Sequence, residues 1–272
     1  MNKILRKFGF LGLFLLIFSN LPLQASHMMG SDITWTCVGK DSFMIKLVIY
    51  RDCNGVPLGT PSIPIKCAST GITITTVSIS KPPPVDITPT CGSSCTRCQS
   101  SGCSFPYGIE QYTFTKLVVF NTTCCDLIVS YQECCRNGTI TTGAANANYY
   151  IDAKMNRCQN PCDNSPRFTN PPIAIICVGQ DFIFNHGVID IDIDSNGGLI
   201  DSLSYEWTQP LTGAGSYTTW TSPYSYDKPV FFWGFPNANL PSPRGFHLDP
   251  ATGDISFRPM KVEQTVMAIK IG

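Results

Sequence analysis

The sequence has little charge and few of the side chains that usually carry catalysis. Only 14% of its residues are charged, and the formal net charge is zero. Nucleic acids and anionic membranes are bound by basic surfaces, so we expect neither as a partner. It contains three histidines and few glutamates, which are Glu110, Glu133, Glu206 and Glu263. No base–nucleophile pair or carboxylate pair can be identified, and we expect no enzymatic activity.

Long apolar runs are also missing, apart from one at the start. Lys3, Arg6 and Lys7 precede an apolar run from Phe8 to Phe18, which is too short to cross a bilayer. A positive region, a short apolar region and a cut at about Ser26 define a signal peptide, residues 1–25. We therefore expect a secreted or cell-surface protein with no transmembrane segment, and a net charge of about −3 after cleavage.

No long amphipathic helix with caps is present, whereas short strand patterns separated by Gly/Pro turns recur. The expected strands are 33–38, 43–50, 72–80, 112–120, 127–131 and 149–155. The length allows one large β domain or two of ordinary size. We predict an all-β fold with two β-sandwich-like domains, residues 27–165 and 170–272. The segment between them is rich in Pro and Asn and has no periodicity.

The second domain would have a core of its own. Its expected core residues are Phe182, Phe184, Tyr205, Trp207, Phe231, Phe257 and Ile269. The chain ends in a strand pattern, VMAIKIG, and we expect it to be a fragment of a longer protein. Other domains of that longer chain would then be its partners.

All fourteen cysteines follow the signal peptide, and thirteen of them lie at or before Cys162, which predicts a disulfide-rich first domain. The disulfide candidates are Cys37, Cys53, Cys67, Cys91, Cys95, Cys98, Cys103, Cys124, Cys125, Cys134, Cys135, Cys158, Cys162 and Cys177. The tight spacing of Cys91, Cys95, Cys98 and Cys103 would also suit a four-thiolate zinc or iron–sulfur site. Oxidation after export favours a disulfide-tied loop instead.

Two vicinal pairs, Cys124-Cys125 and Cys134-Cys135, flank the expected strand 126–133. Neighbouring residues of a strand point to opposite faces. We therefore expect no bond within either pair, and one sulfur of each pair on each side of the sheet. The partners cannot be deduced from the spacing.

An acidic cluster gives one candidate metal site. Asp190, Asp192, Asp194 and Asp201 lie in a glycine-containing segment, and several carboxylates on such a loop suit calcium. The alternative is a solvated turn whose Asp and Asn side chains bond their own backbone. The spacing lacks the glycine and distal glutamate of an EF-hand.

An aromatic stretch, SYTTWTSPYSYDKPVFFWGF, could stack on the apolar faces of sugars. The alternative is packing within the sandwich. A carbohydrate-binding accessory module of a secreted enzyme is therefore the second function that we consider. Surface polysaccharides or proteins would be its ligands, and Trp220 is the side chain whose replacement would test it.

Four segments together give a family resemblance. SHMMGSDITWTC, LVIYRDCNG, YQECCRNGTITTG and SPRFTNPPIAIICVGQDFIFNHG resemble the N-terminal region of large secreted Bacteroidota surface proteins. These are gliding-motility-associated or PKD-domain proteins, similar to type IX secretion cargo. The resemblance covers nearly all of the chain after the signal peptide. It implies a non-enzymatic structural or adhesive part of a surface protein, linked to surface adhesion or gliding motility.

The second half resembles cadherin-like and immunoglobulin-like modules. The pattern F-x-L-D-x-x-T-G-x-I-x-x-x-P is matched at Leu248, Asp249, Thr252, Gly253, Ile255 and Pro259. We expect Leu248-Asp249-Pro250 and Thr252-Gly253 to form the turn before the final strands. The acidic half of the pattern is interrupted by residues 195–200, which changes the spacing of the aspartates that the resemblance would assign to calcium.

Overall fold

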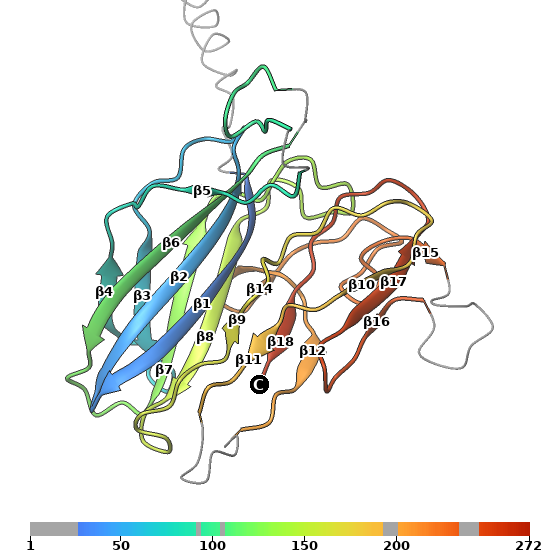
Figure 1. Ribbon diagram of the computed structural model, residues 1–272. Coiled ribbons are helices and arrows are strands. Elements are labelled where there is room, and N and C mark those ends of the chain that lie inside the picture. Colours follow the sequence, from blue (N-terminus) through green and yellow to red (C-terminus); the bar gives the residue numbers. More distant parts are fainter. Residues whose placement is uncertain (1–26, 91–93, 104–106, 193–200, 234–244) are drawn as a thin grey trace, which may run out of the picture.

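The structure, a computed structural model, describes residues 27–90, 94–103, 107–192, 201–233 and 245–272. It consists of strands and loops (Figure 1). Within the described ranges there is no helix, and hence no helical segment that could span a membrane. The expected all-β class is confirmed. The predicted signal peptide, Cys91 and Asp194 lie outside the described residues.

The strands follow one another from the N-terminal side to Gly272. They are β1 (Met28–Gly39), β2 (Ser42–Asp52), β3 (Ser62–Cys67), β4 (Thr73–Ser78), β5 (Val85–Asp86), β6 (Ile109–Val119), β7 (Asp126–Glu133), β8 (Tyr149–Asn156), β9 (Arg167–Phe168), β10 (Phe182–Phe184), β11 (Val188–Ile189), β12 (Tyr205–Trp207), β13 (Leu211–Gly213), β14 (Ser216–Tyr217), β15 (Phe232–Trp233), β16 (His247–Leu248), β17 (Ile255–Pro259) and β18 (Ile269–Ile271).

Two antiparallel sheets face each other in residues 27–165, which we call the first half of the chain. One of them also includes β13 and β14 from the second half, the residues after 165. Their strand orders are β1-β2-β6-β5 and β14-β13-β8-β7-β3-β4 (Figure 1). In β2 the alternate residues Phe43, Ile45, Leu47 and Ile49 are at most 1% exposed. They belong to one buried cluster with side chains of the opposite sheet, such as Leu127. Period-two alternation thus gives β2 an apolar inner face that packs as one layer of a sandwich.

The outer face of β2 is also buried in its second half. Val48 and Tyr50 are 3% and 5% exposed. The segment 168–171, which follows the first core, borders them on this face. The sheet therefore has a cover of its own chain on the side that the opposite sheet does not reach.

Strand β3 was missed from the sequence, because Pro64 lies in its middle. Pro64 pairs with Thr76 of β4, whereas the ladder between β3 and β7 starts only at Ile65. A proline has no N–H to donate, so it is excluded from the interior of most sheets. Here β7 pairs with β3 beyond the proline, and the strand is tolerated.

A second buried cluster lies in the C-terminal half. Six of the seven expected core residues are in or packed against it, together with Leu248 and Ile255. Phe231 instead contacts Tyr224 edge-on, with ring centroids 5.3 Å apart. The strands around this core are short and form small sheets, β10-β17-β15 with β16, β12-β18 and β9-β11.

The turn expected between β16 and β17 is present. The Asp249 carboxylate accepts hydrogen bonds from the backbone N–H groups of Ala251 and Thr252, at 2.8 and 2.9 Å. Gly253 has a φ of 75° and lies against the ring of Tyr205, where a Cβ would come within 2.7 Å. Only glycine combines this backbone conformation with so close an approach.

One hairpin crosses between the two halves. Strands β13 and β14 pair with each other, and Leu211 pairs with Tyr150 of β8, so the hairpin extends the six-stranded sheet of the first half. The sequence placed residues 170–272 in a separate sandwich, and this hairpin departs from that expectation. No local pattern reveals such a pairing, because a hairpin can join either sheet with the same residues.

The buried inner face of β2 gives a stability prediction. Replacing Leu47 by Ala should lower the free energy of unfolding by about 2–5 kcal/mol, because its side chain is fully buried in the first core. Replacing Val119 of β6, which is 66% exposed, by Ala should change it by less than about 0.5 kcal/mol. Urea unfolding of both variants measures the difference, and equal effects would contradict the assigned inner face.

Candidate functional site

Twelve of the cysteines form six disulfides in the described residues. The pairs are Cys37–Cys162, Cys53–Cys98, Cys67–Cys124, Cys95–Cys103, Cys125–Cys158 and Cys134–Cys135. Cys177 is free and exposed. All six bonds lie at or before Cys162, so crosslinking among the described cysteines is confined to the first core and the segment that leaves it.

The two vicinal pairs behave differently. Cys124 bonds Cys67 at the end of β3, and Cys125 bonds Cys158 just after β8. Two separate partners were expected and are found, and they lie beside β3 and β8, the two strands that flank β7.

The expectation for Cys134-Cys135 was wrong, since these two residues bond each other. The pair follows the last residue of β7, Glu133, so the alternation of strand faces does not apply to it. Its peptide bond is cis, and the two Cα atoms are 3.1 Å apart.

The cysteine-rich loop does not form a thiolate metal cluster from its described residues. Cys95 and Cys103 bond each other, and Cys98 bonds Cys53 at the end of β2. A disulfide sulfur is no longer a thiolate, which is the form that binds zinc. The structure therefore agrees with the disulfide-tied loop, which the Cys53–Cys98 bond fastens to the first sheet.

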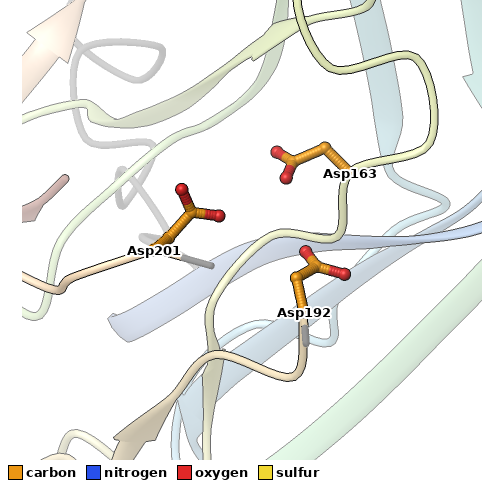
Figure 2. Close-up of side chains that lie close together, drawn as sticks. All are labelled: Asp163, Asp192 and Asp201. Atoms are coloured by element: carbon orange, nitrogen blue, oxygen red, sulfur yellow. The ribbon is translucent and has the colours of Figure 1, made fainter. Parts of the chain in front are cut away.

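Three carboxylates converge between the two halves (Figure 2). Ligand oxygens of Asp163, Asp192 and Asp201 all lie within 4.8 Å of one another. Asp163 follows Cys162 in the segment that leaves the first core, and Asp192 follows the short strand β11. Of the four predicted calcium ligands, Asp192 and Asp201 are thus brought together.

The other two predicted ligands, Asp190 and Asp194, are not part of this cluster as described. Asp194 lies outside the described residues. The Asp190 carboxylate accepts a hydrogen bond from the N–H of Asp192 at 2.8 Å, so it caps its own turn. This is the arrangement expected for the alternative, a turn whose aspartate bonds its own backbone.

The convergence has an electrostatic cost. Burial, and next the negative charges of Asp192, Asp201 and Asp190, raise the pKa of Asp163 to about 6. Asn164 offsets part of this cost, because its backbone N–H donates to Asp192 Oδ2 at 2.8 Å. Carboxylates at such distances stay ionised only when a cation or hydrogen-bond donors balance them. A divalent cation with oxygen ligands would suit this donor set.

Asp163 was missed from the sequence. It lies far from Asp192 along the chain. Its position in the fold is determined by the neighbouring Cys37–Cys162 disulfide. That partner could not be deduced from cysteine spacing. Its position one residue after a cysteine was the only local signal.

Two of the motifs that carry the family resemblance meet at the start of β1. In YRDCNG, the buried Asp52 accepts a hydrogen bond from the side-chain amide of Asn137, at 3.1 Å. Asn137 belongs to CCRN, and its N–H donates to the carbonyl of Met28 at 3.2 Å. Met28 in turn donates to the carbonyl of Cys135 at 3.1 Å. The motifs therefore close one end of the first sandwich.

Two other motif residues extend this closure. Arg51 pairs with Glu110 of β6 and donates to the carbonyl of Val56 at 2.8 Å. Arg136 donates to the carbonyl of Leu211 at 2.8 Å, which holds the crossing hairpin. Each of these two arginines donates a hydrogen bond to a backbone carbonyl, and Arg51 also pairs with a carboxylate of the fold.

A small polar recess lies between β2 and the segment 168–171. Its volume is about 100 Å³, and Asp32, Lys46 and Tyr50 contribute polar groups. Burial raises the pKa of Asp32 to about 6. Pockets for small-molecule ligands usually have about 300–1,000 Å³, so this recess is too small for a substrate of that size.

The aromatic stretch is divided between packing and exposure. Trp220 is half-buried beside the 142–143 loop, where the N–H of Thr221 donates to the carbonyl of Thr142 at 3.1 Å. Tyr217 and Trp233 are more than half exposed. The side chain of Trp220, which was chosen to test sugar binding, is thus only partly exposed.

Comparisons of the chain with protein-family models, with curated proteins and with solved structures find no match.

The motif contact predicts a stability effect. Replacing Asn137 by Ala should lower the free energy of unfolding by about 1–3 kcal/mol, because the buried Asp52 loses a hydrogen-bond donor. Asn54 also donates to Asp52 but is exposed, and Asn54→Ala should cost less. Urea unfolding compares the two variants. A larger loss for Asn54→Ala would contradict the role of Asn137.

The carboxylate cluster predicts a calcium effect. If it binds calcium with the affinity of extracellular modules, 10 mM calcium should raise the melting temperature by roughly 3–8 °C at pH 7.5. The shift should shrink at pH 5, because Asp163, with a pKa of about 6, is then protonated. Thermal melts with calcium or with EDTA measure it.

The matched variants are Asp192→Asn, which removes a ligand, and Glu206→Gln, which removes an exposed carboxylate paired with Lys270. The calcium shift should disappear in the first and persist in the second. An unchanged melting temperature of the unsubstituted protein at millimolar calcium would rule the site out.

Proposed function

We propose that this chain is a secreted, non-enzymatic structural part of a cell-surface protein, which spaces or presents surfaces used in adhesion or gliding. The observation that carries the proposal is the set of six disulfides around the first core. Disulfides of this number persist outside reducing compartments and are typical of secreted domains.

The roles of the motif residues support a structural function. Arg51, Asp52, Arg136 and Asn137 are all buried, and each contacts another part of the fold. Catalytic residues usually face a cleft, whereas these residues close the end of a sandwich. The resemblance to large Bacteroidota surface proteins rests on the same residues, and it supplies the adhesive or gliding context of the proposal.

Cell attachment tests the proposal. Cells of the source organism that lack residues 27–272 of this protein should attach to surfaces or glide less than the parent, and the full chain should restore them. Biotinylation of intact cells with an impermeant reagent should label the protein. A protein that is inaccessible in intact cells, or turnover in a broad hydrolase screen, would overturn the proposal.

The redox state gives a separate prediction. In the exported protein, an impermeant maleimide should label Cys177 and leave the twelve bonded cysteines unlabelled until a reductant is added. The variant Cys177→Ser should lose this label. Mass spectrometry of the labelled peptides makes the count. Release of Cys95, Cys98 and Cys103 by a zinc chelator would contradict the disulfide assignment.

A further inference from the structure

The Cys37–Cys162 disulfide closes the chain around the first core. Cys37 lies near the end of β1, and Cys162 lies beyond β8, the last long strand of this core. The two residues are 125 positions apart in the sequence, but their Cα atoms are 5.2 Å apart. Strands β2 to β8 therefore all lie within one covalently closed loop.

The segment after Cys162 lies along the free edge of β1. Trp35 N–H donates to the Ser165 hydroxyl at 2.7 Å, and Ser165 N–H donates to the Trp35 carbonyl at 3.1 Å. Cys37 N–H donates to the Asn164 side chain at 2.9 Å. Asn164 also contacts Asp192 of the second half. A short path thus runs from β1 through the disulfide to the second half.

We infer that this disulfide is a mechanical bypass, which carries tension from β1 directly to the second half and keeps β2 to β8 out of the loaded covalent path. The inference rests on the proposed function, since a spacer in a surface protein is pulled along its chain. A force applied to the two ends of the chain follows the shortest covalent path. That path omits the whole closed loop.

The geometry of β1 determines how the tension acts between Met28 and Cys37. Ten register pairs join β1 to β2 in antiparallel order. Tension enters near Met28 and leaves at Cys37, so it acts along β1 and loads together the nine pairs from Met28–Arg51 to Cys37–Phe43. While the disulfide is intact, the first half can contribute at most the ten or so residues of β1 to the extended length, which is about 4 nm of chain.

A second covalent path lies behind the first. Cys67–Cys124 and Cys125–Cys158 are joined by the single peptide bond between Cys124 and Cys125. Without the Cys37–Cys162 bond, tension would run from Cys37 to Cys67, across both bonds, and from Cys158 to Cys162. This path has roughly 35 extensible residues, about 12 nm of chain.

Single-molecule stretching tests the inference. Handles are placed before His27 and after Gly272, and the protein is unfolded with its disulfides intact and again after reduction in the instrument. Reduction should add about 40 nm to the final length, because the loop of 125 positions becomes extensible. If the oxidised and reduced proteins reach the same final length, the inference fails.

Variants separate this disulfide from the others. Cys37→Ser with Cys162→Ser should add about 12 nm in oxidising buffer, since the path through Cys124-Cys125 then carries the force. Cys95→Ser with Cys103→Ser removes a bond that joins residues only 8 positions apart, and it should add nothing. A gain in the second variant, or none in the first, would overturn the bypass. The reduced protein gives an answer even if the first variant does not fold.

The outcomes distinguish this inference from the proposed function. If maleimide counting finds Cys37 and Cys162 reactive in the exported protein, the bond is absent and the bypass fails with it. If the bond is present but reduction adds no length, the bypass fails while surface location and attachment can still hold. If attachment is unaffected and the lengths are as expected, the bypass stands as a property of the fold.

Discussion

The rest of the structure depends on how the chain leaves its first core. At that point a disulfide joins Cys162 to Cys37, and residues 164–165 bond the free edge of β1. A loop of this length loses about 5 kcal/mol of entropy in the unfolded state when it is closed. The same contact covers an edge strand, which would otherwise present unpaired N–H and C=O groups to other chains. One contact thus serves stability and solubility together.

The two halves are fastened at more than this one place. The hairpin β13–β14 adds to the sheet edge at β8, and Arg136 holds its first carbonyl. Thr141 N–H donates to the carbonyl of Gln264 at 2.8 Å. Such exchanges make the second half part of the closure of the first.

Local patterns in the sequence predicted most of the first sandwich, and long-range pairing limited the rest. The alternation in β2 and the turn at Asp249 could be read directly, since each depends on residues that are close in sequence. Strand β3 was hidden by Pro64. The partners of Cys162 and of Leu211 could not be predicted, because one sequence does not specify which distant segments meet. Asp163 was missed for the same reason, and with it a third of the carboxylate cluster.

The carboxylate cluster follows from the same disulfide. Cys162 is fixed against β1, so its neighbour Asp163 is held near Asp192. Burial, and next the like charges around it, raise the pKa of Asp163 to about 6. A flexible linker would let these carboxylates separate and would relieve the repulsion. The crosslink prevents this, so the folded protein at neutral pH either bears the repulsion or binds a cation. A cation bound there would join the two halves where the covalent path between them is shortest, and it would stiffen the same segment that carries the load.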